Sequence, residues 1–266
     1  MTQHRERPTY RLRFETGIAT HVGKVRRVNE DSGVALPDLG VWAVADGMGG
    51  HTDGQFASRT LTNELASTGL AASPADQVAR FKDRVMAGNH TIRQRAQARG
   101  GATIGTTLAA MLAFDHSYSC VWAGDSRVYL LRNGVLSQVT KDHTEAQELV
   151  DSGVLTREQA KTWPRRNVIT RAVGIFEDPE LEERTGDLRP ADTFVLCSDG
   201  LTGHLSDEEI ATMAYRLRPQ QACDALIEAT LERGATDNVT VIVVRCHATE
   251  PTVALDITGA RPVQPS

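Results

Sequence analysis

The order in which strand-like and helix-like segments follow one another constrains the fold of this chain more than any other feature. Apolar, β-branched runs of strand length come in series, and amphipathic helical patterns come in separate blocks rather than after each strand. The strand-like runs lie at residues 41–45, 106–114, 119–124, 193–197 and 239–244. This order predicts an α+β fold built from layers, and it argues against a parallel sheet of alternating βαβ units.

Two short segments, 127–131 and 135–139, are expected to form a β-hairpin. They flank Asn133-Gly134, a dipeptide that tolerates a positive φ at both central positions of a tight hairpin turn. The sheet in this part of the chain is therefore expected to be antiparallel.

Capping residues mark where the helices begin. A Ser or Thr precedes the helical pattern at three places, and a Glu or Gln three residues later completes a capping box at two of them. The expected starts are Ser73 with Pro74 after it, Thr156 with Gln159, Ser206 with Glu209, and Pro219 for a last helix that stops near Gly234. An earlier helix carries Phe56, Leu61 and Leu65, and we expect it to pair with the helix that follows Ser73.

The chain of 266 residues is expected to form one large domain with extensions. Hydrophobic residues make up 40% and charged residues 24%, a composition that excludes a disordered chain. Residues 144–166 have a helical pattern between strand regions, so we interpret them as an insertion at a sheet edge. Residues 247–266 carry three prolines and no Phe, Trp or Tyr, which predicts a flexible tail.

Charge and hydropathy exclude several classes of partner. The net charge is -5 and no dense basic run occurs, which argues against nucleic acid. The longest uncharged apolar run, 108–114, is far shorter than the roughly 20 residues that span a bilayer, and the first residues lack the apolar core of a signal peptide. We therefore expect a cytoplasmic protein that binds no membrane. The four cysteines are far apart and mostly in apolar runs, so they are interpreted as buried thiols.

Acidic residues stand where strand-like runs end. Asp46 and Asp199 each close such a run and are followed by a glycine-rich or helix-capping segment, which argues against a hairpin turn. The glycine after each aspartate leaves a backbone carbonyl exposed beside the carboxylate. Oxygen ligands of this kind suit Mg²⁺ or Mn²⁺. A third pair, Asp53-Gly54, is interpreted as an ordinary turn.

Further acidic residues, Glu30, Asp31, Asp125 and Asp237, occupy comparable places. Each of them alone is typical of a cap or a turn. Gathered in one cleft with the two aspartates above, they would repel one another strongly unless cations neutralised them. A site for a polyvalent metal ion is the economical explanation.

Arg26, five residues before Asp31, has the planar fork that grips a phosphate, although alone it would be a surface charge. The sequence does not contain the motifs of other phosphatase mechanisms or of a nucleotide phosphate loop. Six residues instead of five separate Cys120 from Arg127, no D-x-D nucleophile pair occurs, and the sequence contains no G-x-x-x-x-G-K-[ST] phosphate loop.

Eight motifs together resemble the metal-dependent protein serine/threonine phosphatases of type 2C in their bacterial form. They follow the order of that family over residues 10–246, which leaves residues 1–9 as an N-terminal extension and makes 144–166 the flap beside the cleft. The motifs are GKVRRVNED (23–31), VADGMGGH (44–51), GTTLAA (105–110), AGDSRVY (123–129), TKDHT (140–144), NVITRAVG (167–174), LCSDGLT (196–202) and TDNVTVIVV (236–244).

The resemblance implies a four-layer α-β-β-α sandwich of two antiparallel sheets flanked by helices. It also implies a centre for two Mn²⁺ or Mg²⁺ ions, with a weaker third ion, in a cleft at one edge of the sheets. The implied metal ligands are Asp46 bridging both ions, Asp199 and Asp237 on the first, the Gly47 carbonyl with Asp31 or Glu30 on the second, and Asp125 with Asp199 on the third. Arg26 matches the arginine that binds the phosphate.

The sequence departs from the family pattern at the place of the proposed general acid. Animal members have a histidine where Met48 stands here, which leaves the proton donor unassigned. His51 is near in sequence, but a structural role is preferred for it. We also expect Thr106 and Thr107 to be structural rather than catalytic.

The implied activity is hydrolysis of phosphoserine and phosphothreonine on proteins through a metal-bridging water. The implied partners are phosphorylated proteins, in a pathway that opposes a bacterial serine/threonine kinase, and we expect a monomer. The alternative is a regulator on the same fold that binds phosphoproteins without hydrolysing them. Such proteins usually lose metal-binding aspartates, whereas Asp46, Asp199 and Asp237 are all present here.

Overall fold

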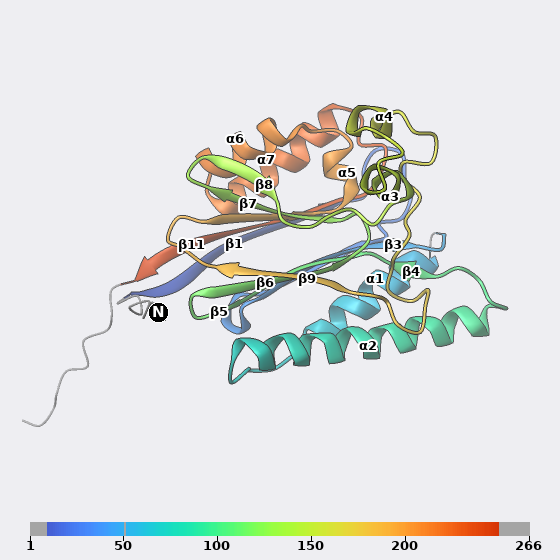
Figure 1. The fold of residues 1–266 in the computed structure, drawn as a ribbon, viewed down its shortest axis with the longest axis horizontal. Helices are drawn as coiled ribbons and strands as arrows, with labels where there is room; N and C mark the ends of the chain where they lie inside the picture. Colours follow the sequence, from blue (N-terminus) through green and yellow to red (C-terminus); the bar gives the residue numbers. More distant parts are fainter. Residues whose placement is uncertain (1–9, 51, 250–266) are drawn as a thin grey trace, which may run out of the picture.

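Two antiparallel sheets lie face to face at the centre of the structure, and helices cover the outer side of each sheet (Figure 1). The computed structural model describes residues 10–50 and 52–249. The predicted α+β architecture, a four-layer sandwich of antiparallel sheets between helices, is confirmed.

The strands of the first sheet run in the order β1-β11-β10-β7-β8, and those of the second in the order β2-β3-β5-β6-β9, with β4 beside β3. The first sheet contains β1 (Arg11–His21), β7 (Arg127–Arg132), β8 (Val135–Gln138), β10 (Thr193–Cys197) and β11 (Val239–Thr249). The second contains β2 (Asp31–Leu36), β3 (Val41–Met48), β4 (Gly105–Thr106), β5 (Leu108–Phe114), β6 (Ser117–Ala123) and β9 (Glu182–Asp187).

The helices divide between the two outer sides. Helices α1 and α2 pack on the second sheet, and α5, α6 and α7 pack on the first. Their bounds are α1 (Thr52–Leu65), α2 (Pro74–Ala98), α3 (Glu145–Asp151), α4 (Arg157–Lys161), α5 (Asp199–Thr202), α6 (Asp207–Arg216) and α7 (Pro219–Glu232), and a short 3-10 helix, η1, spans Pro37–Leu39.

Strand β3 shows why its apolar run is continuous. Side chains alternate across a strand, so Trp42 and Val44 point between the sheets while Val41, Ala43 and Ala45 point toward α1 and α2. All five are fully buried. Strand β10 repeats this pattern between the sheets and the helices of the other side. Strands covered on both faces need apolar residues at every position, and for this reason both runs could be predicted.

The predicted local signals are found in the structure. Asn133 and Gly134 have φ of 53° and 78°, as a tight hairpin turn requires. The Ser73 hydroxyl accepts a hydrogen bond from the Asp76 N–H at the start of α2, and both predicted capping boxes form. Helices α1 and α2 pack on each other as expected.

The predicted insertion lies at a sheet edge. Helices α3 and α4 connect β8 to the segment before β9, and these two strands are edge strands of the two different sheets. Figure 1 shows both helices at one end of the sandwich, above the end of β3.

Several sequence interpretations were wrong. Asp53 and Gly54 belong to the first turn of α1 instead of a separate turn. The tail does not begin at residue 247, because β11 continues to Thr249 and His247 bonds to Glu15 of β1. Strands β1, β2 and β9 were not predicted at all. The expected N-terminal extension 1–9, the tail from residue 250 onward and His51 lie outside the described residues.

All four cysteines are buried and unpaired, as predicted. Cys120 and Cys246 lie between the sheets, and Cys197 of β10 and Cys223 of α7 lie in the core between the first sheet and its helices. Burial raises the pKa of Cys197 to about 12, which keeps the thiol protonated and unreactive. In the described part of the chain, no helix combines the length and apolar character that crossing a membrane requires.

Candidate metal centre

The predicted aspartates meet where strands of both sheets end. Asp31 lies opposite Asp46 in the pairing of β2 with β3. Asp199 follows β10, and Asp237 precedes β11, the neighbour of β10 in the other sheet. Stacking of the sheets brings these residues and Asp125 around Asp46, whose pKa is raised well above its usual range by burial and by the four neighbouring carboxylates.

Two threonines fix the backbone of Asp46. The Asp46 N–H donates to Thr107 Oγ1 over 3.0 Å, and the Thr107 N–H donates back to the Asp46 carbonyl over 2.8 Å. Thr106 Oγ1 donates to the same carbonyl over 3.0 Å. Thr107 Oγ1 also shares a hydrogen bond of 2.7 Å with the buried Ser126 hydroxyl. These contacts give both threonines the structural role that was predicted for them.

Asp31 is one of the buried carboxylates of the cluster, with 5% of its surface exposed. Ser198 Oγ donates to Asp31 Oδ2 over 2.7 Å. Asp31 Oδ1 is buried without a hydrogen-bond partner. Burial raises the pKa of Asp31 to about 7. A buried carboxylate oxygen without a donor is costly, and a cation would remove this cost.

Asp199 stands at the first position of α5, where the chain turns sharply. A Cβ on the following residue, Gly200, would lie 1.9 Å from the Asn238 carbonyl oxygen, so only glycine fits there. Burial and the charge of Asp237 raise the pKa of Asp199, while Asp46 acts in the opposite direction.

Asn238 organises the loop that carries Glu30, a role that sequence reasoning missed. Its Oδ1 accepts a hydrogen bond from the Glu30 N–H over 2.8 Å, and its Nδ2 donates to the carbonyls of Val22 and Val28. The sequence signal for this role is the motif TDNV, in which Asp237 was singled out as a metal ligand and Asn238 was not.

Gly54 shapes the other wall of the site and was also missed. A Cβ there would lie 2.2 Å from Glu30 Oε1 and 2.9 Å from the Gly47 carbonyl oxygen. The carboxylate of Glu30 and the carbonyl of Gly47 therefore converge on the space in front of Gly54. A side chain at residue 54 would fill a cradle that two of the predicted oxygen ligands line.

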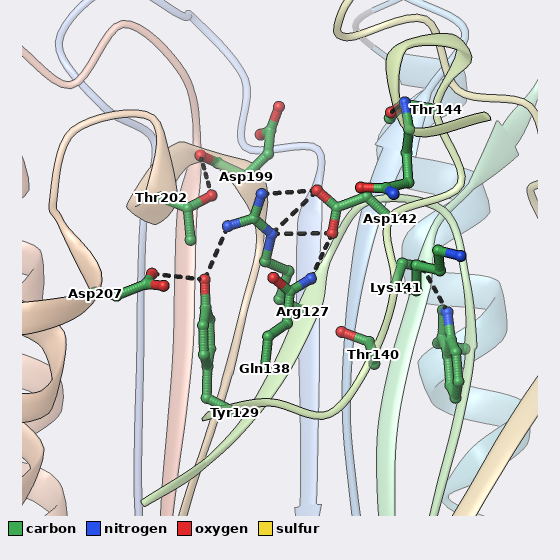
Figure 2. A network of polar contacts seen from close by, with 12 residues as sticks. Arg127, Tyr129, Gln138, Thr140, Lys141, Asp142, Thr144, Asp199, Thr202 and Asp207 are labelled. Atoms are coloured by element: carbon green, nitrogen blue, oxygen red, sulfur yellow. Dashed lines mark hydrogen bonds and ion pairs between the residues drawn. The ribbon is translucent and has the colours of Figure 1, made fainter. Parts of the chain in front are cut away.

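Asp125 lies beside an arginine network that Figure 2 shows. Arg127 holds Asp142 with Nε to Oδ1 at 2.9 Å and Nη2 to Oδ2 at 2.7 Å, and its Nη1 donates to the Tyr129 hydroxyl over 2.8 Å. Burial, followed by the charge of Asp199, raises the pKa of Asp125 to about 8, while Arg127 acts in the opposite direction. The network thus places one cation, already paired with Asp142, beside the acidic cluster.

Arg26 contacts the cluster from the solvent side. Its Nη2 donates to Asp237 Oδ2 over 2.7 Å, and this hydrogen bond raises the pKa of Arg26. About half of the Arg26 side chain is exposed. Arg26 also lines a cavity of about 230 Å³ with Glu30 and Gly50.

The donor chemistry of the site fits hard divalent cations. Its groups are carboxylate and carbonyl oxygens, one of which, Asp31 Oδ1, is buried and orphaned. Across residues 10–50 and 52–249, however, no three carboxylate, imidazole or thiol groups already form a compact ligand set. In this arrangement Asp237 accepts a hydrogen bond from Arg26. The individual ligand assignments stay predictions.

The chain is similar to known proteins in both sequence and structure. The family model described as protein phosphatase 2C matches residues 26–239. Over 223 residues the chain is 41% identical to the serine/threonine protein phosphatase PstP of Mycobacterium tuberculosis, a match that covers 83% of this chain and 43% of PstP. The chain thus spans less than half the length of this curated relative.

Two solved structures are similar to most of the chain. PppA, described as a key regulatory component of T6SS in Pseudomonas aeruginosa, is 40% identical with a TM-score of 0.82, covering 88% of this chain and 98% of PppA. The catalytic domain of PstP in complex with two manganese ions is 37% identical with a TM-score of 0.80, covering 90% of this chain and all of that domain. On these matches the chain belongs to the protein phosphatase 2C family.

Proposed function

We propose that this protein is a serine/threonine protein phosphatase that depends on Mn²⁺ or Mg²⁺. One observation carries the proposal: five aspartates from both sheets, Asp31, Asp46, Asp125, Asp199 and Asp237, interact at one end of the sandwich. Such a concentration of negative charge is unfavourable unless cations offset it. The family match and the two manganese ions of the similar PstP domain support the same activity.

Asp46 would bridge two ions, with Asp199 and Asp237 on the first and the Gly47 carbonyl with Asp31 or Glu30 on the second. A weaker third ion would lie at Asp125 and Asp199. When bound, the ions supply an activated water and offset the charge that builds up on the phosphoryl oxygens.

The residues of the chain itself position the substrate and the site. Arg26 would orient the phosphoryl group with its planar fork, and its exposed side chain can turn from Asp237 toward an incoming phosphate. Thr106 and Thr107 hold Asp46 in place by its backbone. We expect no cysteine nucleophile, because all four thiols are buried.

We further propose that the substrates are proteins phosphorylated by a serine/threonine kinase that this phosphatase opposes. The relatives named as serine/threonine phosphatases support this class of substrate. A cytoplasmic monomer stays our prediction for the state in which the protein acts.

The test is phosphate release from a phosphothreonine peptide. We expect turnover with Mn²⁺ or Mg²⁺ and none in excess EDTA. Asp46→Asn should lower kcat at least about a thousandfold, roughly 4 kcal/mol of transition-state stabilisation, while the fold is kept. Full turnover in EDTA would refute metal dependence, and phosphopeptide binding without any turnover would favour the non-catalytic regulator.

A further inference from the structure

Arg93 is an exception among the arginine and lysine side chains of α2 and the residue that follows this helix. The others all have an acidic partner within 4 Å: Arg80 pairs with Asp76, Lys82 with Glu183, Arg84 with Glu64, and Arg95 and Arg99 both with Asp53. Arg93 has neither an ion pair nor a side-chain hydrogen bond with any described residue. An arginine that is free in this way has its full donor capacity available for a ligand.

The guanidinium-bearing side chain of Arg93 lines a cavity of about 250 Å³. The other described lining residues are uncharged: Ala96, Gln97, Gly101, Ala102, Thr103, Ile104, Gly174 and Ile175. Gln97 and Thr103 add polar side chains, and no lining carboxylate offsets the arginine. The cavity is therefore positive and suits an anionic group with three or four oxygens or a carboxylate.

The wall of this cavity is continuous with the segment that holds the Asp46 backbone. Its wall residue Ile104 leads into β4 and Thr107, which hold the backbone of Asp46. A Cβ on Gly49 would lie 2.8 Å from the Thr103 carbonyl oxygen, so the loop that follows Asp46 touches the cavity wall. Figure 1 shows the end of α2 at the same end of the sandwich as β4 and the end of β3.

The same loop reaches the cavity that Arg26 lines. Gly50 contributes to the Arg26 cavity, while Gly49 contacts the wall of the Arg93 cavity. Two consecutive glycines, Gly49 and Gly50, therefore border the two cavities. An extended peptide advances about 3.3 Å per residue, so a side chain two or three positions from a bound phosphoresidue lies about 7–10 Å away.

We propose that Arg93 and its cavity form a subsite for an anionic side chain of the protein substrate, close in sequence to the phosphorylated residue. The anion is a carboxylate or a second phosphate, since both match the guanidinium fork. This inference rests on the proposed function, and it adds a substrate preference that Arg26 and the metal centre do not supply.

The experiment compares phosphothreonine peptides that carry Ala, Glu or phosphoserine at one flanking position, scanned over two and three residues on either side. We expect one position at which an anionic residue raises kcat/KM about three- to tenfold over Ala, as an exposed charge-assisted contact provides. The Glu and phosphoserine peptides distinguish the two sources of the anion.

The variant Arg93→Ala should reduce this ratio to about one, and Arg93→Lys should restore part of it. Arg84→Ala is the matched control, because it removes the same charge from the same helix but outside the cavity, and it should keep the preference. Hydrolysis of p-nitrophenyl phosphate, which has no flanking residue, should be unchanged in all three variants.

An unchanged anionic preference in Arg93→Ala, or no preference in the wild type at any scanned position, would overturn the subsite. A loss of p-nitrophenyl phosphate turnover in Arg93→Ala would show a structural role instead and would also overturn it. Absence of turnover by the wild type on every substrate with Mn²⁺ present would instead refute the proposed function, so the two failures are distinct.

Discussion

Replacing Thr107 by Val tests whether this threonine holds Asp46 in place or takes part in the chemistry. Valine has the same shape as threonine but lacks the hydroxyl. The change removes the bond that Thr107 Oγ1 accepts from the Asp46 N–H and the bond that it shares with Ser126. The Asp46 N–H and the buried Ser126 hydroxyl then lose a partner.

The expected cost follows from these two groups. A buried polar group left without a partner costs about 1–3 kcal/mol, so Thr107→Val should lower the free energy of unfolding by about 2–6 kcal/mol. Thr107→Ser keeps the hydroxyl and loses only the methyl group that packs on Gly124, which costs about 1 kcal/mol. The measurement is urea unfolding of both variants in EDTA, so that bound ions do not contribute.

The turnover of the same variants distinguishes a positioning role of the Thr107 hydroxyl from a direct role in the reaction. If the hydroxyl acts only through the Asp46 backbone, Thr107→Ser keeps near-normal kcat, whereas Thr107→Val loses both stability and turnover. Equal unfolding free energies for the Val and Ser variants would show that the Thr107 hydroxyl does not hold the Asp46 backbone in place. A Val variant of normal stability without activity would give the hydroxyl a direct role that the structure does not support.

Three further outcomes are expected. Arg26→Ala should lower kcat/KM for a phosphopeptide by about one to three powers of ten, since Arg26 is proposed to bind the phosphate. A titration with Mn²⁺ should show no weaker ion binding, because Arg26 pairs with Asp237 and would compete with an ion for it; weaker ion binding would contradict this. The melting temperature of the metal-free protein should fall as the pH rises from about 5 to about 8. Over this range the raised pKa values of Asp31 and Asp125 make the folded state hold more protons than the unfolded state. A melting temperature that rises with pH over this window would refute the shifts. Iodoacetamide should leave the turnover of the native protein unchanged because the thiols are buried, and inactivation without unfolding would revive a cysteine mechanism.

The strands that could be predicted are those whose residues all lie in the same kind of environment, such as the buried interior. Strand β3 is buried on both faces and is therefore apolar throughout. Strand β9 lies at a sheet edge with mostly exposed side chains, EERTGD, and its sequence has no strand pattern. Strand β1 pairs with β11 over eleven residues, but polar residues alternate irregularly along it, so its register comes from the partner strand.

The residues of the candidate site also divide into those that a local sequence pattern indicates and those that it does not. Asp46 and Asp199 could be singled out because each interrupts an apolar strand end, a purely local signal. Gly54 and Asn238 act only through residues far away in sequence, Glu30 and the loop 22–30. No local pattern reports such contacts, and the dipeptide Asp53-Gly54 even suggested a turn where the structure has a helix.

The central claim is that the aspartates around Asp46 hold the divalent ions on which the activity depends. Calorimetric titration of Mn²⁺ into the metal-stripped wild type and into Asp46→Asn tests it most directly. We expect two tightly bound ions in the wild type and the loss of tight binding in the variant, because the carboxylate proposed to bridge the ions is gone. Circular dichroism should show that the fold of the variant is intact. Unchanged stoichiometry and affinity in Asp46→Asn, or a wild type that binds no ion, would contradict it.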